Sequence, residues 1–146
     1  MMTNSKGACS ARAAHAVVLF GILFGGSACG QTSFFDVMVT VKQVQGVTQD
    51  SLRQINSCQV TVSGASSDAF PLDNCVFGLV QSFAIGTFQY GTDKDSGTVN
   101  FQVDLIGQDR RTVLGSGTGG AAIKSGGRQT LAVEVVPDPT KFNLPQ

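Results

Sequence analysis

Histidine and cysteine supply most of the nucleophiles and metal ligands of proteins, and the chain has one histidine, His15, and four cysteines at positions 9, 29, 58 and 75. His15 stands in an N-terminal stretch that we expect to be removed, for reasons given below. The mature chain would then hold no imidazole for a Ser-His-Asp or Cys-His pair, for a zinc site with His ligands or for a blue-copper site. We therefore expect no enzyme activity and no bound cofactor.

Two aspartates, Asp93 and Asp95, stand two residues apart in the polar stretch 91–97, a spacing that opens many calcium loops. The third ligand, the glycine position and the closing glutamate of an EF-hand do not follow them. The pattern predicts a solvated hairpin turn, with a weak calcium site as the alternative. Tyr90, beside Phe88, is a candidate surface on which a sugar ring could stack.

A second group of charges comprises Asp104 and Asp109 with Arg110 and Arg111, and Glu134 is the only glutamate of the chain. A glycosidase needs two carboxyl groups that flank one sugar bond, so an acid pair among these residues is a hypothesis to be weighed. The run 107–111 is more typical of a solvated turn. We therefore assign none of these residues to catalysis.

The segment 115–120 reads Gly-Ser-Gly-Thr-Gly-Gly and matches the spelling G-x-G-x-x-G of dinucleotide-binding loops. That motif needs a strand before it, a helix after it and an acid some 20 residues later. Here a short apolar run and another glycine turn follow, which do not predict a helix. The segment is therefore predicted to be a glycine-rich bulge or loop and not a nucleotide site.

The N-terminal residues indicate the cell compartment in which the mature chain is expected. Lys6 and Arg12 occur without any acid, an apolar run follows at 16–24, and small residues occupy 25–28. This order is typical of a cleavable secretory signal, which we assign to residues 1–28. The apolar run is far shorter than the roughly 20 residues of a spanning helix, and no later stretch approaches that length. We expect no transmembrane helix in the mature chain.

The end of this signal, Gly-Ser-Ala-Cys at 26–29, resembles the lipobox of bacterial lipoproteins. The resemblance implies that Cys29 is lipidated and becomes the acylated N-terminus, with 29–33 as a tether. Gly30 after the cysteine implies sorting to the outer membrane. Gly26 stands where the family usually has Leu and also suits an ordinary cut after Ala28, so a secreted or periplasmic protein is the alternative.

The remaining cysteines then form an even set. With Cys9 removed in the signal and Cys29 lipidated, Cys58 and Cys75 are left in an oxidising compartment, where we expect them to form a disulfide. A hairpin that folds back at 66–67 would place these two cysteines directly opposite each other, Val60 opposite Asp73, and Val62 opposite Pro71. Pro71 lacks an N–H and so predicts an edge strand.

Alternating apolar residues predict strands along the rest of the chain. The clearest runs are 35–41, 58–62, 99–105 and 131–135, while 43–56 is predicted to be a connection with one helical turn at most. The slipping alternation between 77 and 90 predicts two short strands or one strand with a bulge. Residues 112–115 and 121–124 supply further strand positions.

About seven strands separated by polar turns are typical of an antiparallel β-sandwich, which we place at 34–137, followed by a loose tail at 138–146. The strand order over 97–137 is similar to the closing strands of immunoglobulin-like and fibronectin-type domains of bacterial surface proteins. That resemblance implies an immunoglobulin-like sandwich. The chain has no Trp, so the Cys-Trp-Cys pattern of antibody domains is absent.

The full chain is formally neutral, and Lys6 and Arg12 are the only charges of the signal, so the mature part has a slight acidic excess. This balance argues against a nucleic-acid partner. The sequence therefore predicts a cell-envelope lipoprotein that acts as a structural or interaction module, attached to the membrane by its lipid and contacting an envelope protein or polysaccharide. The alternative is a secreted or tethered module that binds calcium or carbohydrate.

Overall fold

The structure, a computed structural model, describes residues 31–72, Cys75 and residues 84–142. The predicted signal, Cys29 and strand positions 77–83 lie outside these residues. The described part of the chain forms seven strands, one α-helix and one 3-10 turn. In order they are β1 (Ser33–Val41), α1 (Gln49–Leu52), β2 (Ile55–Gly64), β3 (Asp68–Pro71), β4 (Ala84–Thr92), β5 (Thr98–Gly107), β6 (Val113–Ala122), β7 (Arg128–Pro137) and η1 (Pro139–Lys141).

All seven strands belong to one sheet in the order β3-β2-β5-β6-β7-β1-β4. β1 pairs antiparallel with β4 and parallel with β7, so the sheet is mixed. The predicted antiparallel sandwich is therefore wrong in this respect, and no two-sheet sandwich or immunoglobulin topology is shown among the described residues. A parallel pair between the first and last strands leaves no local signal, because its side chains alternate just as those of an antiparallel pair do.

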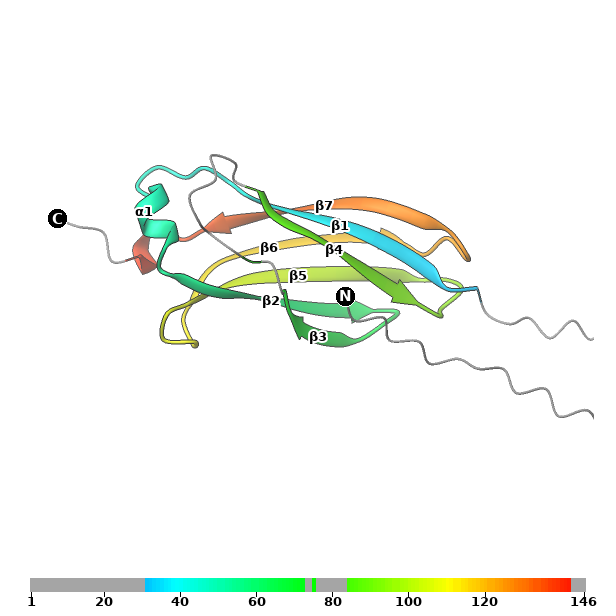
Figure 1. The fold of residues 1–146 in the computed structure, drawn as a ribbon. Coiled ribbons are helices and arrows are strands. Elements are labelled where there is room, and N and C mark those ends of the chain that lie inside the picture. Colours follow the sequence, from blue (N-terminus) through cyan, green and yellow to red (C-terminus); the bar gives the residue numbers. More distant parts are fainter. Residues whose placement is uncertain (1–30, 73–74, 76–83, 143–146) are drawn as a thin grey trace, which may run out of the picture.

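The sheet curls into a half-barrel because β7 crosses the inner face of β6 at close range. A Cβ atom at Gly117 would lie 2.3 Å from the carbonyl oxygen of Glu134, and one at Gly115 would lie 2.7 Å from that of Val136. Figure 1 shows the result: β7 and β1 lie above β5, β2 and β3, with β6 between, and β4 runs diagonally across the view from beside β1 to below β5. We call the two parts the β1 arm (β4, β1 and β7) and the β5 arm (β3, β2, β5 and β6).

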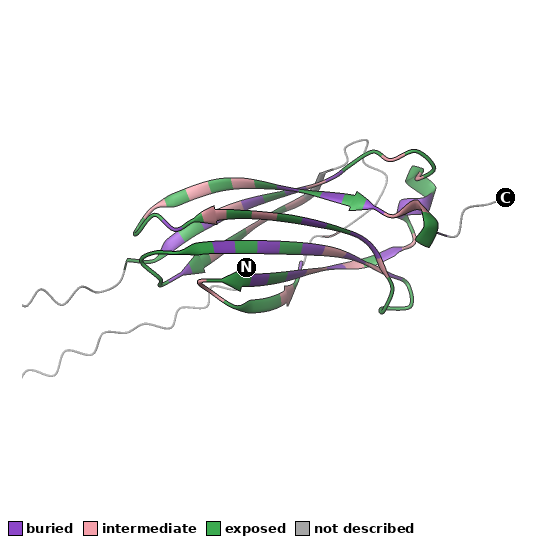
Figure 2. Cartoon of the chain, turned by 180° about the vertical axis from the view of Figure 1, so that it is seen from behind, coloured by how far each residue is buried: buried purple, intermediate pink, exposed green. Residues whose placement is uncertain are grey.

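The core fills the space between the two arms. Buried and exposed residues alternate along the strands, as Figure 2 shows, because successive side chains of a strand point to opposite faces. Phe35 of β1 meets Phe101 of β5 with ring centroids 5.7 Å apart, and both side chains are fully buried. The alternation that predicted β1, β2, β5 and β7 is confirmed.

The two edge strands of the curled sheet meet through aromatic rings. The ring of Phe70 on β3 stacks on that of Tyr90 on β4, at a centroid distance of 6.4 Å and an interplanar angle of 7°. Phe70 also meets Phe88 edge-on at 5.6 Å. Side chains, which need no register of backbone hydrogen bonds, therefore hold the two edges together.

The hairpin of β2 and β3 exists, but its register differs from the predicted one. Val60 pairs with Phe70 and Val62 with Asp68, so the return arm is shifted by three residues. The reversal begins at Gly64, whose φ of 96° suits glycine, and not at 66–67. Pro71 lies on an edge strand, as its missing N–H predicts.

The structure also describes the predicted helical turn, the predicted bulge and part of the predicted tail. The single helical turn expected in 43–56 is α1, which Thr48 caps by accepting a hydrogen bond from the Ser51 backbone N–H. The expected bulge lies in β4, where the register with β1 shifts between Gly86 and Ala84. The described part of the tail is not loose, because Asp138 caps η1 and the side chain of Phe142 is only 5% exposed.

Candidate functional site

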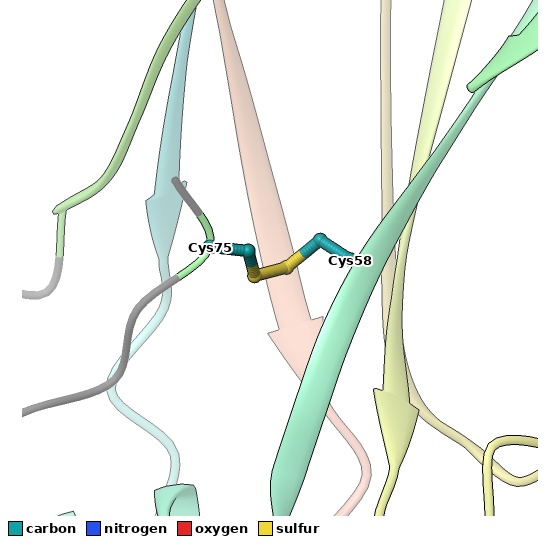
Figure 3. Close-up of a disulfide and its surroundings, with 2 residues drawn as sticks. All are labelled: Cys58 and Cys75. Atoms are coloured by element: carbon teal, nitrogen blue, oxygen red, sulfur yellow. A yellow bond between two sulfur atoms is a disulfide. The ribbon is translucent and has the colours of Figure 1, made fainter. Parts of the chain in front are cut away.

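Cys58 and Cys75 form a disulfide, with Cα atoms 5.7 Å apart (Figure 3). The bond does not join directly opposed residues of a hairpin. The Leu72 backbone N–H donates to the carbonyl oxygen of Cys58, and the Cys75 N–H donates back to that of Leu72. The chain after β3 therefore turns back toward β2, and the bond attaches this turn to a buried position of the core.

Asp93 and Asp95 lie in the exposed turn between β4 and β5. The Ser125 hydroxyl, from the turn between β6 and β7, donates to Asp95 Oδ1 at 3.2 Å. Within the described residues, no three His, Cys, Asp or Glu side chains lie close enough together to hold a metal ion. Asp95 thus links two neighbouring turns at one end of the sheet.

Tyr90 faces inward and does not offer a stacking surface for a sugar. Its ring lies between that of Phe70 and that of Phe101, whose centroid is 5.5 Å away at an interplanar angle of 81°. Burial raises the pKa of the Tyr90 phenol above its usual value, while a hydrogen bond with Ser66 acts in the opposite direction. The structure does not favour the candidate sugar surface at Tyr90, because the protein's own rings pack against this partly buried side chain.

The other acids do not converge on a common point. Asp104 Oδ1 accepts a hydrogen bond from Ser116, and Asp109 accepts hydrogen bonds within its own turn. Glu134 lies on β7 beside Lys42, with Nζ and Oε1 3.7 Å apart. Each carboxyl group has a local partner, and Glu134 lies on the other arm from Asp104 and Asp109, so the geometry does not form a glycosidase-type pair from them.

Asp109 organises the turn between β5 and β6. Its carboxylate accepts from the backbone N–H of Arg111 and of Thr112 and from the Thr112 hydroxyl. These hydrogen bonds, that from the hydroxyl first, lower the pKa of Asp109 from 3.8 to about 2. They also support Arg110 in a left-handed backbone conformation, with φ of 57°. Asp109 and its neighbours are thus turn residues.

The glycine-rich segment 115–120 lies inside strand β6 and is not a loop, although the register with β5 shifts at its start, between Gly115 and Val113. Its inward-facing glycines, Gly115 and Gly117, lie against the backbone of β7, as described above. The glycines that match the dinucleotide-binding pattern are therefore explained here by the close packing of β6 against β7. The element directly after it is strand β7 and not the helix that the dinucleotide motif requires.

A shallow hollow on the outer face of the β5 arm was not predicted from the sequence. It measures about 450 Å³, and its polar lining includes Ser63 of β2, Asn100 and Gln102 of β5, and Thr118 of β6. Gly120 leaves room for the Asn100 amide, whose Oδ1 would lie 2.5 Å from a Cβ at 120. The sequence feature that could have indicated this hollow is the row of polar residues that alternate with buried ones on β5.

The outer face of the β1 arm holds a bidentate ion pair that also had no local signal. Arg128 of β7 donates through Nη2 to Asp36 Oδ1 of β1 at 2.9 Å and through Nε to the other carboxylate oxygen. Gln89 of β4 donates to Asp36 as well. The hydrogen bond from Arg128, followed by that from Gln89, lowers the pKa of Asp36. This pair tethers the two parallel strands.

The chain matches no family model and no curated protein. Among solved structures it is similar to a fimbrial assembly protein from Parabacteroides distasonis ATCC 8503, with a TM-score of 0.45 and 11% identity. The alignment covers 74% of this chain and 53% of that one, so this chain spans about half the length of the protein it resembles. The likeness is distant.

The described residues form a curled sheet that carries one disulfide and a polar hollow on one outer face. The groups expected to do chemistry serve turns, strand pairing and the disulfide. No helix in the described part of the chain has the length and apolar character to cross a membrane.

Proposed function

We propose that the chain is an exported cell-envelope lipoprotein, attached through lipid on Cys29, whose β domain acts as a structural or interaction module without catalysis. The observation that carries the proposal is the Cys58–Cys75 disulfide within the folded domain. Disulfides of this kind persist in oxidising compartments outside the cytoplasm. They agree with the signal read at 1–28 and with the assignment of Cys29 to the lipid.

Two further features support the proposal. The disulfide engages the two cysteines that follow Cys29, which leaves Cys29 as the thiol available for a lipid. The carboxyl groups of Asp104, Asp109 and Glu134 each have local partners, which favours a structural role over a hydrolytic one. Gly30 after the cysteine favours the outer membrane as the location, with secretion or a periplasmic location as the alternative.

Intact-mass measurement of the protein purified from membranes tests the anchor. We expect a polypeptide that begins at Cys29 and carries diacylglyceryl and acyl groups. The matched control is Cys29→Ala, which keeps the signal and the small side chain needed for an ordinary cut and should be found without lipid in the soluble fraction. A bare wild-type polypeptide in the medium would contradict lipidation and leave the secreted alternative.

A second candidate function, ligand binding, is favoured by the hollow on the β5 arm and not by Tyr90. Amides of Asn100 and Gln102 and hydroxyls of Ser63 and Thr118 are neutral groups suited to a polyhydroxylated ligand such as a sugar. Cellobiose or an N-acetylglucosamine oligomer added to labelled protein should shift the side-chain amide resonances of Asn100 and Gln102. Unchanged resonances at millimolar sugar would remove this candidate for those two sugars.

A further inference from the structure

The chain is held by the folded domain almost directly after Cys29. The Gln31 side chain lies over Gly126 in the turn between β6 and β7, where a Cβ atom would be 2.1 Å from Gln31 Oε1. Gly126 has φ of +64°, so both its conformation and this contact favour glycine. Ser33 completes the attachment, because its hydroxyl donates to the Lys124 carbonyl oxygen and accepts from the Gly126 N–H.

Within the expected tether at 29–33, the described residues Gln31 and Ser33 contact the domain, which leaves Cys29 and Gly30 as the part that could act as a flexible link. Only two residue steps separate Cys29 from Gln31, which span at most about 7 Å when fully extended. A flexible linker would let a domain leave the surface to which its lipid is attached. This one is too short to allow that.

The end of the sheet next to this attachment, which we call the proximal end, comprises the turns at 65–67, 93–97 and 123–127 and lies at the right in Figure 1. The opposite, distal end carries α1 and the turn at 108–112. Proximal side chains such as Ser66, Lys94 and Ser125 are small or charged. They suit contact with lipid headgroups and not insertion among acyl chains.

One large apolar side chain is exposed beside the attachment point. Phe34 is 38% exposed, and its ring packs against Gly91, where a Cβ would lie 3.1 Å from Phe34 Cε1. Its backbone N–H donates to the Gly127 carbonyl oxygen, so its position is determined by the same turn that holds Gln31. An exposed aromatic ring at the anchored end suits the boundary between headgroups and acyl chains.

We infer that the proximal end rests on the bilayer to which the lipid on Cys29 is attached, with Phe34 at the headgroup boundary and the distal end facing away. The inference rests on the proposed lipidation. It commits the domain to one orientation, because the attachment of Gln31 and Ser33 to the turn at 123–127 prevents rotation about a flexible linker. Partners would then meet the distal end and the outer faces of the two arms.

Tryptophan fluorescence tests this orientation, because the chain has no Trp. Phe34, Met38 and Val136 are exposed by 38%, 43% and 45%, and they lie at increasing distance from the attachment. Met38 shares the strand and the outer face of Phe34 and is four residues, about 13 Å, farther along. The variants Phe34→Trp, Met38→Trp and Val136→Trp are therefore matched probes of depth.

Each lipidated variant is placed in vesicles of brominated phosphatidylcholine, and its emission is compared with that in unbrominated vesicles. We expect the largest loss of emission for the probe at 34, a smaller loss at 38 and none at 136. Thr32→Trp, at an exposed position of the same end, is a second probe if the probe at 34 does not fold. Ten Gly/Ser residues inserted between Gly30 and Gln31 should abolish the loss at 34.

The experiments distinguish a failure of the proposed lipidation from a failure of the proposed orientation. Intact mass without lipid contradicts the proposed function. Lipid present by mass, with losses of emission that do not differ between 34 and 136, overturns the orientation alone. A strong loss at 34 that survives the inserted linker shows that Phe34 binds the bilayer independently of the short tether, and this also overturns the inference as stated.

Discussion

Gly117 on β6 faces the backbone of Glu134 on β7 so closely that a methyl group at 117 would lie 2.3 Å from the Glu134 carbonyl oxygen. Two residues on, a Cβ at Gly119 would lie 2.9 Å from Leu131 Cδ1. Alternate glycines thus remove the side chains from one face of β6. The β1 arm can then fold over the β5 arm, and the curl depends on this absence of Cβ atoms.

Replacing Gly117 by Ala should destabilise the fold by about 1–3 kcal/mol, the usual cost of overpacking, because the obstacle is backbone and cannot rotate away. Gly120→Ala is the matched control on the same strand. Its nearest obstacle, Asn100 Oδ1 at 2.5 Å, is the end of a movable side chain. Urea unfolding of both variants measures the difference, and equal losses would show that β7 does not restrain β6 in this way.

Removing the disulfide should also destabilise the domain. The two cysteines are 17 positions apart in the sequence, and closing a loop of this size contributes about 3 kcal/mol in the chain-entropy model. The double variant Cys58→Ala with Cys75→Ala and the reduced wild type should therefore both unfold at lower urea than the oxidised protein. A free-thiol count of two or more in the oxidised mature protein, measured under denaturing conditions, would contradict the bond itself.

Tyr90 is the only tyrosine of the chain, so its titration can be followed by ultraviolet absorbance without overlap. Burial raises its pKa above the usual 10.0, so the neutral phenol is favoured by the fold. Its contribution to stability is complete below pH 10.0 and is lost as the pH rises through the folded-state pKa. Titration in urea provides the reference, and identical curves in the two conditions would refute burial of the ring.

Acid should loosen the turn between β5 and β6. The pKa of Asp109 is lowered from 3.8 to about 2, so its contribution to stability is present above pH 3.8 and is lost as the pH falls through about 2. The wild type should therefore be more stable than Asp109→Asn at neutral pH, and this difference should shrink toward pH 2. Thermal unfolding at several pH values measures it. A difference that stays constant with pH would exclude the charge as its cause.

Much of the fold follows from local patterns. Alternating apolar residues located β1, β2, β5 and β7, Pro71 indicated an edge strand, and the polar stretch before Ile55 was correctly limited to one helical turn. The register of the β2–β3 hairpin was missed because the positive φ of Gly64 moves the reversal toward the N-terminus. The glycines of β6 predict a bulge or loop and not a continuous strand, because glycine usually weakens a strand.

The candidate sites were harder to predict than the strands. The sequence identified Cys58 and Cys75 as a pair, since cysteine number and compartment constrain pairing without any coordinates. The sequence could not show that Tyr90 points inward. A bulge of one residue reverses which side chains of a strand face inward and which face outward. The hollow around Asn100 needs three strands from different parts of the chain, so no window of sequence contains it.

The sequence by itself determined the strand content, the expectation of export and the pairing of cysteines, because each depends on residue type, local periodicity or number. Only the tertiary structure decided that β1 pairs parallel with β7, that the sheet is single and curled, and that Gln31 is held by the turn at 123–127. These features join residues roughly 90 positions apart, as the contact between Ser33 and Lys124 does across 91. Packing between such distant segments leaves no local periodicity to read.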